Sequence, residues 1–183
     1  MTRLFVAITL DEKIKEKITE LYEKFPENVI KAKFVPKDNI HITLKFIGEK
    51  RDDDINDIIK SLKHSHDDIG PFSLHIYGVG AFPHSFAPKI IWVGANEPKI
   101  EELAQSIDDH LATLGIKKEQ KPYKAHITFA RVKSVYEKKD VNDIIKSLND
   151  IEIGTQDVTS FSLVKSTLTP KGPIYSTVKD FFL

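Results

Sequence analysis

The feature of this sequence that most constrains its fold is an internal repeat about 86 residues long. Four segments return in the same order, with offsets of 85 to 89 residues. The paired segments are Leu4–Ala7 with Ile90–Val93, His41–Leu44 with His126–Phe129, Ile55–Leu62 with Val141–Leu148, and Phe72–Leu74 with Phe161–Leu163. A shared offset across four segments indicates a duplicated structural unit. We therefore expect one domain over 1–183, built of two pseudo-repeat units at approximately 1–86 and 87–183.

The hydrophobic periodicity within each unit predicts a mixture of strands and helices. Short β-rich runs, such as 4–10, 40–47 and 125–130, alternate with segments whose apolar residues recur at helical spacing. Asp11 is a candidate helix cap. Two further strands are expected near 160–168 and 174–181, around a Pro-Lys-Gly-Pro turn. The expected class is α+β, with helices on one face of each sheet and the other face available for ligands.

Composition excludes several classes of protein. The 183-residue chain has 27 basic and 27 acidic residues, so it is not a broadly basic nucleic-acid coat. It has no cysteine, which excludes disulfide scaffolds and cysteine nucleophiles. No apolar run approaches the ~18 residues of a membrane span, and the short apolar start at 4–8 is too brief for a signal peptide. We expect a cytoplasmic protein that does not enter membranes.

The chemically informative residues lie on the two His-Ile-Thr strands of the repeat. Alternation along a strand places His41, Thr43 and Lys45 on one face, opposite Ile42 and Leu44. By the same rule His126 and Thr128 share a face. Residues two apart on a strand are about 6.6 Å apart, so each His and Thr can reach one phosphate-sized group. The repeat supplies two such pairs, which we expect to line opposite walls of one cleft.

Two histidines in one cleft suit acid–base chemistry at phosphorus. An ordinary histidine titrates near 6.5, so one imidazole can accept a proton while the other donates one. Threonine hydroxyls can donate to the non-bridging oxygens, and Lys45 can add positive charge. A metal site is the competing interpretation, but neither histidine has a carboxylate nearby on its strand face. The acidic run 51–54 and the run 64–68 lack a further spaced ligand. We expect no metal and no cofactor.

Charge and aromatic residues near these strands favour a polyanionic ligand. Segments 30–50 and 117–133 carry net charges of +3 and +5 in an otherwise acidic chain. Tyr123, Phe82 and Phe86 lie in or near loops, where an aromatic ring can stack on a base. Core packing is the competing interpretation for each of them.

These motifs resemble the two-histidine phosphoesterase superfamily, and specifically the RNA 2′,3′-cyclic phosphodiesterases once named 2′-5′ RNA ligases. The resemblance covers nearly the whole chain. The segments that carry it are Arg3–Ile8, His41–Glu49, Gly80–Pro83, His126–Arg131 and Gly172–Tyr175. Ala125 stands where the family often has proline, a difference expected to affect only entry into the strand.

The resemblance implies a bilobal α+β fold with a central cleft, antiparallel sheets and outer helices. It implies metal-free opening of a cyclic phosphate to a 2′-phosphomonoester, with His41 as proton donor and His126 as proton acceptor. Thr43 and Thr128 complete the catalytic set, and Lys45, Arg131, Tyr123 and Phe82 are expected at the substrate. Alternation points Arg131 toward the side of Ile127, so its role requires a bulge at the strand end.

Three functional classes remain open at this point. The first is hydrolysis of RNA 2′,3′-cyclic phosphate ends by a monomer. The second is ATP-independent 2′-5′ RNA ligation by the same residues, because hydrolysis and ligation share a transition state. The third is a non-catalytic module that binds RNA or nucleotides, against which the retention of both histidines and both threonines argues.

Overall fold

A computed structural model describes all residues, 1–183, and arranges the strands in two antiparallel sheets. One sheet has four strands in the order β3-β1-β8-β9. Its strands are β1 (Thr2–Thr9), β3 (His41–Lys50), β8 (Ser160–Thr169) and β9 (Gly172–Phe182). The predicted histidine strand of the first unit, β3, therefore lies at one edge of this sheet.

The second sheet has five strands in the order β2-β6-β5-β4-β7. Its strands are β2 (Ile30–Phe34), β4 (Phe72–Phe82), β5 (Ile90–Asn96), β6 (His126–Val135) and β7 (Glu152–Val158). The second histidine strand, β6, begins at His126. Strand β7 was not indicated by the sequence, since its seven residues include Gly154 and four polar or charged side chains.

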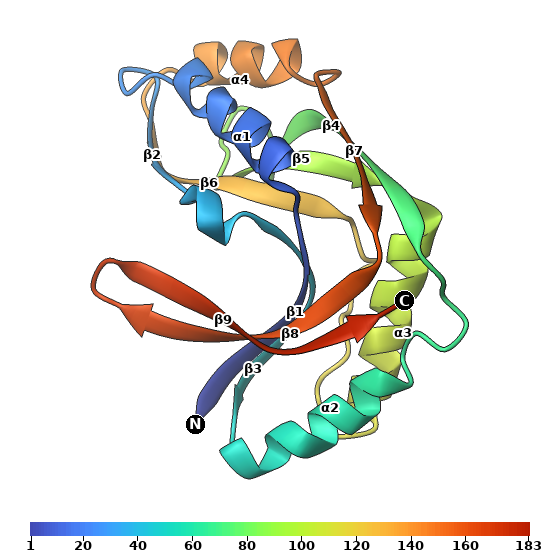
Figure 1. The fold of residues 1–183 in the computed structure, drawn as a ribbon. Coiled ribbons are helices and arrows are strands. Elements are labelled where there is room, and N and C mark those ends of the chain that lie inside the picture. The colour runs from blue at the N-terminus through green and yellow to red at the C-terminus, as the bar shows by residue number, and fades with distance from the viewer.

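Four α-helices lie outside the sheets, as Figure 1 shows. They are α1 (Glu12–Glu20), α2 (Ile55–Lys63), α3 (Pro98–Ala112) and α4 (Lys138–Ser147), with short 3₁₀ turns at Leu21–Lys24, Lys37–Asn39 and Asp52–Asp54. Helices α1 and α4 contact β7 and β4 of the five-stranded sheet. Helix α3 contacts β3, and α2 contacts α3 and β9, on the side of the four-stranded sheet. The predicted α+β class is confirmed.

Equivalent strands of the two sequence units pair in equivalent ways. β1 pairs with β3, and its counterpart β5 pairs with β6. β4 of the first half then pairs with β5 of the second, while β8 of the second half pairs with β1 of the first. Each sheet therefore contains strands from both halves of the chain. The pattern fits a duplication in which the two units exchange strands, which we retain as a proposal.

The hydrophobic core holds these elements together. A cluster of 40 buried side chains draws on both sheets and all four α-helices. It contains Ile42 and Leu44 of β3 and Ile127 and Phe129 of β6, as alternation predicts. Asp11 precedes α1, as expected, but its side chain makes no capping hydrogen bond. None of the helices is both long and apolar enough to cross a membrane.

Candidate active site

His41 is the first residue of β3 and is oriented by hydrogen bonds at both ring nitrogens. Its Nδ1 lies 2.7 Å from the carbonyl oxygen of Asn39, and its Nε2 lies 2.9 Å from Oγ1 of Thr43. A carbonyl only accepts, so Nδ1 carries the hydrogen in the neutral ring. Nε2 then accepts from the Thr43 hydroxyl. The predicted pairing of His41 with Thr43 is therefore direct.

His126 is the first residue of β6 and repeats the Nδ1 contact of His41. Its Nδ1 lies 2.7 Å from the carbonyl oxygen of Lys124, again two residues before the histidine. The neutral ring therefore has the same tautomer as His41, with the lone pair on Nε2. Thr128 follows on the same strand, opposite Trp92 of β5. The two histidine strands thus present matched ring nitrogens.

Burial is the largest influence on both histidines, and it disfavours the charged imidazolium. Burial lowers the pKa of His41, the hydrogen bond to Asn39 opposes this, and the charges of Arg131 and Lys15 lower it further. Burial likewise lowers the pKa of His126, opposed by the bond to Lys124 and reinforced by the charge of that lysine. Both rings are therefore biased toward the neutral form when no anion is bound.

Two aromatic rings that the sequence did not assign to the site lie beside His41. The rings of Phe5 and Tyr175 have centroids 5.1 and 5.3 Å from the imidazole, and 5.0 Å from each other. They line a cavity of about 150 Å³ that also includes Lys15 and Thr177. His126 is not among its lining residues, so a single cleft shared by both histidines stays a prediction. Phe5 and Tyr175 lie in two of the segments that carry the family resemblance, and that resemblance could have identified them as site residues.

A second aromatic group lies beside His126. Phe82, one of the predicted substrate-contacting residues, has its ring centroid 5.2 Å from the imidazole in an edge-to-face arrangement. Trp92 lies 6.3 Å from the same ring, and the Lys124 ammonium lies 4.7 Å from the centroid of Trp92. Gly80 is required here, because a Cβ at that position would lie 2.4 Å from the Trp92 ring. These contacts place a cation and two aromatic rings around His126.

The expectation that Lys45 contacts substrate is wrong. Its side chain is 1% exposed, and its ammonium pairs with Asp108 of α3 at 2.6 Å. The reason is a bulge in β3: Ala7 of β1 is opposite Thr43, but the preceding Val6 is opposite Lys45, so Leu44 has no partner. The extra residue reverses the alternation that placed Lys45 beside Thr43.

Arg131 lies on the site side for the corresponding reason. Trp92 of β5 is opposite Thr128 and Ile91 is opposite Ala130, which leaves Phe129 without a partner. The bulge that its role required is thus present, and Arg131 is exposed. Its charge acts on His41 and on Tyr175, which belong to the other sheet. Arg131, on β6, therefore lies near enough to His41, on β3, to lower the pKa of that histidine.

Tyr123 is partly buried and links the loop before β6 to the core and to β3, so its predicted contact with substrate stays a prediction. Its hydroxyl donates to the backbone carbonyl of Thr43 at 2.9 Å, and its ring packs against the core. Burial raises the pKa of this phenol, which keeps it a donor. This contact joins the loop before β6 to β3, and strands β3 and β6 also contact each other. Of the predicted aromatic residues, Phe82 touches a histidine, Tyr123 supports Thr43, and the exposed Phe86 lies near Lys146 of α4.

The structure contains no group of three or more His, Asp or Glu side chains arranged to hold a metal ion. The acidic run and the His-containing run noted in the sequence do not form one. His64 instead lies 3.3 Å from Asp67 as an exposed pair.

Comparisons with known proteins agree with this geometry. The sequence matches the family described as the AKAP7 2′5′ RNA ligase-like domain over residues 4–183. The chain is 39% identical over 179 residues to the RNA 2′,3′-cyclic phosphodiesterase of Methanocaldococcus jannaschii, covering 98% of this chain and 99% of that protein. It is 37% identical over 180 residues to the protein of the same name from Archaeoglobus fulgidus, with 98% and 99% covered.

Solved structures share the fold. The Thermus thermophilus protein TT0787 superposes with a TM-score of 0.83 at 28% identity, covering 99% of this chain and 97% of that one. E. coli LigT in complex with 3′-AMP superposes with a TM-score of 0.79 at 24% identity, covering 100% and 98%. The chain therefore belongs to the 2′-5′ RNA ligase-like family of the two-histidine phosphoesterase superfamily.

Proposed function

We propose that this protein hydrolyses the 2′,3′-cyclic phosphate ends of RNA to 2′-phosphomonoesters. The observation that carries the proposal is the matched orientation of His41 and His126, each holding Nδ1 on a backbone carbonyl two residues earlier. In each ring Nε2 is then the atom that transfers the proton; at His41 the substrate oxygen would replace the Thr43 hydroxyl as its partner. The relatives from M. jannaschii and A. fulgidus bear the name RNA 2′,3′-cyclic phosphodiesterase, which supports the same reaction here.

The proposed reaction is one in-line displacement at phosphorus. His126 accepts a proton from water at Nε2 as the water oxygen bonds to phosphorus. The bond from phosphorus to the ribose 3′ oxygen breaks, and His41 donates its proton to that oxygen. The phosphate stays on the 2′ oxygen. Each proton transfer is commonly worth ~10²–10⁴-fold in rate.

The lowered histidine pKa values favour the base role of His126 directly, and they are compatible with the acid role of His41 once substrate is bound. A lowered pKa keeps His126 neutral and able to act as a base near neutral pH. His41 has to be protonated to act as the acid. An anionic phosphate bound beside it favours the imidazolium, which offsets the effects of burial and of Arg131.

Neighbouring side chains supply charge stabilisation and contact with the nucleotide. We assign the Thr43 and Thr128 hydroxyls to the non-bridging oxygens, where donors act on developing charge. Arg131 supplies positive charge between the two strands. Phe82 provides an aromatic face beside His126. Tyr123 acts through Thr43, since its hydroxyl bonds the carbonyl of that residue.

We further propose that the protein works as a monomer in the cytoplasm, on RNA and without a metal ion. One chain supplies both histidine strands, which supports a monomer. The absence of cysteine is compatible with a reducing compartment.

The test is incubation of the protein, in EDTA, with an oligoribonucleotide that ends in a 2′,3′-cyclic phosphate. Mass spectrometry and ³¹P NMR identify the product, with His41→Ala as the control. We expect a 2′-phosphomonoester. A 3′-phosphomonoester, or no turnover, contradicts the proposal, and a 2′-5′ linkage to an added 5′-hydroxyl RNA identifies the ligase reaction instead.

A further inference from the structure

Lys45 is a buried cation on the strand that carries His41, and the proposed chemistry does not use it. Its ammonium has three N–H donors and three partners. These are Asp108 at 2.6 Å, the carbonyl oxygen of Lys117 at 2.7 Å and Glu119 at 3.1 Å. The ammonium thus makes two hydrogen bonds, to Lys117 and Glu119, and one ion pair, to Asp108, all of them with protein groups.

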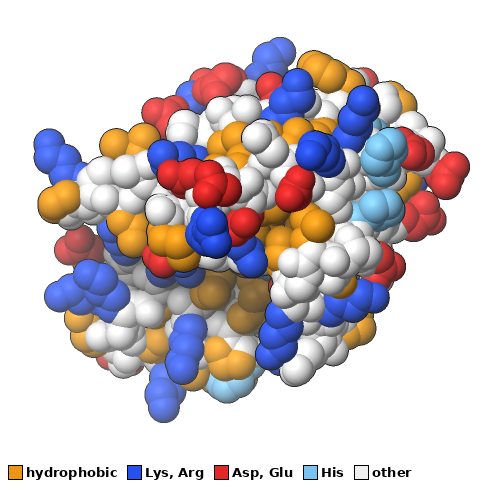
Figure 2. Space-filling model, turned by 90° about the horizontal axis from the view of Figure 1, so that it is seen from below, with side chains coloured by type: hydrophobic (Ala, Val, Ile, Leu, Met, Phe, Trp, Pro, Cys, Tyr) orange, Lys and Arg blue, Asp and Glu red, His pale blue; other side chains and the backbone are white.

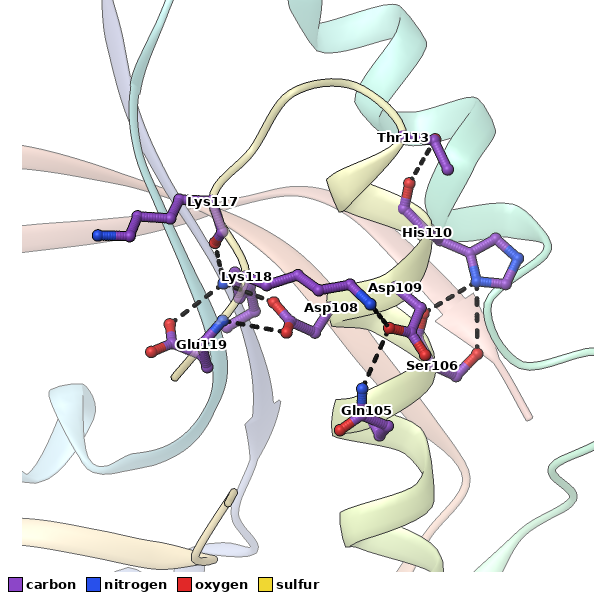
Figure 3. A network of polar contacts seen from close by, with 10 residues as sticks. Gln105, Ser106, Asp108, Asp109, His110, Thr113, Lys117, Lys118 and Glu119 are labelled. Atoms are coloured by element: carbon purple, nitrogen blue, oxygen red, sulfur yellow. Dashed lines mark hydrogen bonds and ion pairs between the residues drawn. The ribbon is translucent and has the colours of Figure 1, made fainter. Parts of the chain in front are cut away.

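The partners of Lys45 come from one continuous stretch of chain. Asp108 lies on α3, and Lys117 and Glu119 lie in the loop that leads from α3 to β6. Figure 3 shows Asp108, Lys117 and Glu119 around one point, with Asp108 projecting from the helix. The other carboxylate oxygen of Asp108 accepts from the backbone N–H of Glu119 at 3.1 Å. The helix and the loop are therefore fastened together as well as to Lys45.

The same loop is attached to β3 at a second point. The Tyr123 hydroxyl donates to the carbonyl of Thr43, two residues before Lys45. The loop then enters β6 at His126, whose ring is held by the carbonyl of Lys124. The stretch of β3 that follows His41 is thus joined twice to the segment that ends at His126.

From these contacts we infer that Lys45 is a positioning residue that sets the placement of the His126 strand relative to the His41 strand. The inference rests on the proposed function, because it matters only if the two histidines act on one phosphate. A misplacement of about 1 Å in a reacting group can cost about 10²-fold in rate. Lys45 lies on β3, and its buried ammonium bonds the backbone of Lys117 in the loop that leads to β6, so it acts on the site through that loop.

The test compares Lys45→Met with the double variant Lys45→Met/Asp108→Asn. The single variant leaves the Asp108 carboxylate buried without its cation, which destabilises the fold. The double variant removes that charge and keeps an amide oxygen to accept from Glu119. We expect the double variant to regain the wild-type melting temperature but to lack the hydrogen bond to the Lys117 carbonyl. Lys60→Met, which breaks an exposed pair with Asp57 on α2, is the control.

On a 2′,3′-cyclic mononucleotide we expect the double variant to lose at least about 10-fold in kcat, with KM within about 3-fold of wild type. In a His126→Ala background the same double substitution is expected to cost less than about 2-fold, because no second histidine remains to be placed. A wild-type kcat in the double variant, with its melting temperature restored, overturns the inference. An equal loss in both backgrounds also overturns it, because that is the result of a general folding defect. If the wild-type protein itself does not open the cyclic phosphate, it is the proposed function that fails.

Discussion

Leu44 and Phe129 occupy equivalent bulges, each three residues beyond the histidine of its strand. Neither has a partner on the neighbouring strand, β1 or β5. Each is buried together with the residue that follows it, Lys45 or Ala130. Two consecutive residues facing the core are the mark of a bulge in a strand that otherwise alternates. The correspondence between the two repeated sequence segments therefore extends to a local irregularity of the backbone.

The bulge exposes the fifth residue after each histidine, and that residue differs between the two strands. Phe46 and Arg131 are the next residues and are exposed on the site side of their strands. The Phe46 ring lies 6.3 Å from Phe5, next to the aromatic group at His41. Arg131 brings a positive charge from the other strand. The repeat thus contributes a ring from one unit and a cation from the other.

The first prediction concerns the histidines as a pair. We expect His41→Ala and His126→Ala each to lower kcat at least ~10²-fold, because each removes one proton transfer from the same transition state. The double variant should be barely worse than the poorer single variant. Single-turnover assays on a cyclic mononucleotide measure this. Thr43→Ala and Thr128→Ala should be milder, since each removes only a donor to oxygen.

Near wild-type turnover in either single histidine variant would show that the two-histidine assignment is wrong. Circular dichroism melting of all five variants is the control for folding. Additive losses in the double variant would mean that the two rings act in separate steps.

The second prediction concerns the influence of Arg131 on His41. NMR titration of the free protein should give both histidines pKa values below ~6.5. In Arg131→Gln the pKa of His41 should rise, because a repelling charge has been removed. The pKa of His126 should move less, since the charge that lowers it is that of Lys124. An unchanged pKa for His41 would place Arg131 away from the site.

The third prediction follows from the same pKa directions and concerns the pH profile. Because both histidine pKa values are lowered, the free enzyme most often holds one neutral and one protonated histidine below pH ~6.5. The pH dependence of kcat/KM reports these ionisations of the free enzyme. We therefore expect kcat/KM to peak on the acidic side of that value and to fall as pH rises. The profile of kcat should peak at higher pH, because bound phosphate favours the imidazolium of His41. Coincident profiles would contradict this coupling.

The fourth prediction concerns metal ions. We expect full hydrolysis of a cyclic phosphate in excess EDTA, because imidazoles, hydroxyls and cations suffice for the proposed step. The measurement is initial rate before and after exhaustive chelation, with a zinc phosphodiesterase as a positive control for metal removal. Loss of activity that a divalent ion restores would overturn the metal-free mechanism.

The fifth prediction separates RNA binding from chemistry. Lys121 and Lys124 precede β6, and phosphates outside the reacting group should release counterions there. We expect KM for an oligonucleotide to rise with salt more steeply than KM for a cyclic mononucleotide. Lys121→Ala/Lys124→Ala should raise the oligonucleotide KM and flatten its slope. The mononucleotide KM should change little, since the carbonyl of Lys124 still holds His126. Loss of the Lys124 charge, which lowers the pKa of His126, should appear separately as a shift of the pH profile.

Lys138→Ala/Lys139→Ala on the outer helix α4 is the matched control, and its salt slope should equal that of the wild type. Basic and acidic side chains are interspersed on the face shown in Figure 2. We therefore expect the salt dependence of KM to change only when lysines near the bound RNA are replaced. Equal slopes for both substrates in the wild type would show that only the terminal nucleotide is recognised.

The proposed catalytic residues could be predicted from the sequence because their signal is local. A His-x-Thr tripeptide on an alternating strand places both side chains on one face whatever surrounds it. The surroundings of Lys45 and Tyr123 could not be predicted because they depend on partners far along the chain. Asp108 pairs with Lys45 in the interior, and the carbonyl of Thr43 accepts from the Tyr123 hydroxyl. Phe5 and Tyr175 meet at His41 only because β1 and β9 both pair with β8.

The sequence by itself determined the α+β class, the repeat, the buried faces of the two histidine strands and the His-x-Thr pairs. Periodicity carries this information, because a strand alternates and a helix turns regardless of the distant chain. The tertiary structure decided the exchange of strands between halves, the burial of Lys45 and the exposure of Arg131. A bulge depends on the register between paired strands, and one extra residue sends every following side chain to the opposite face. Which face Lys45 and Arg131 occupy was therefore settled only when β3 and β6 paired with their neighbours.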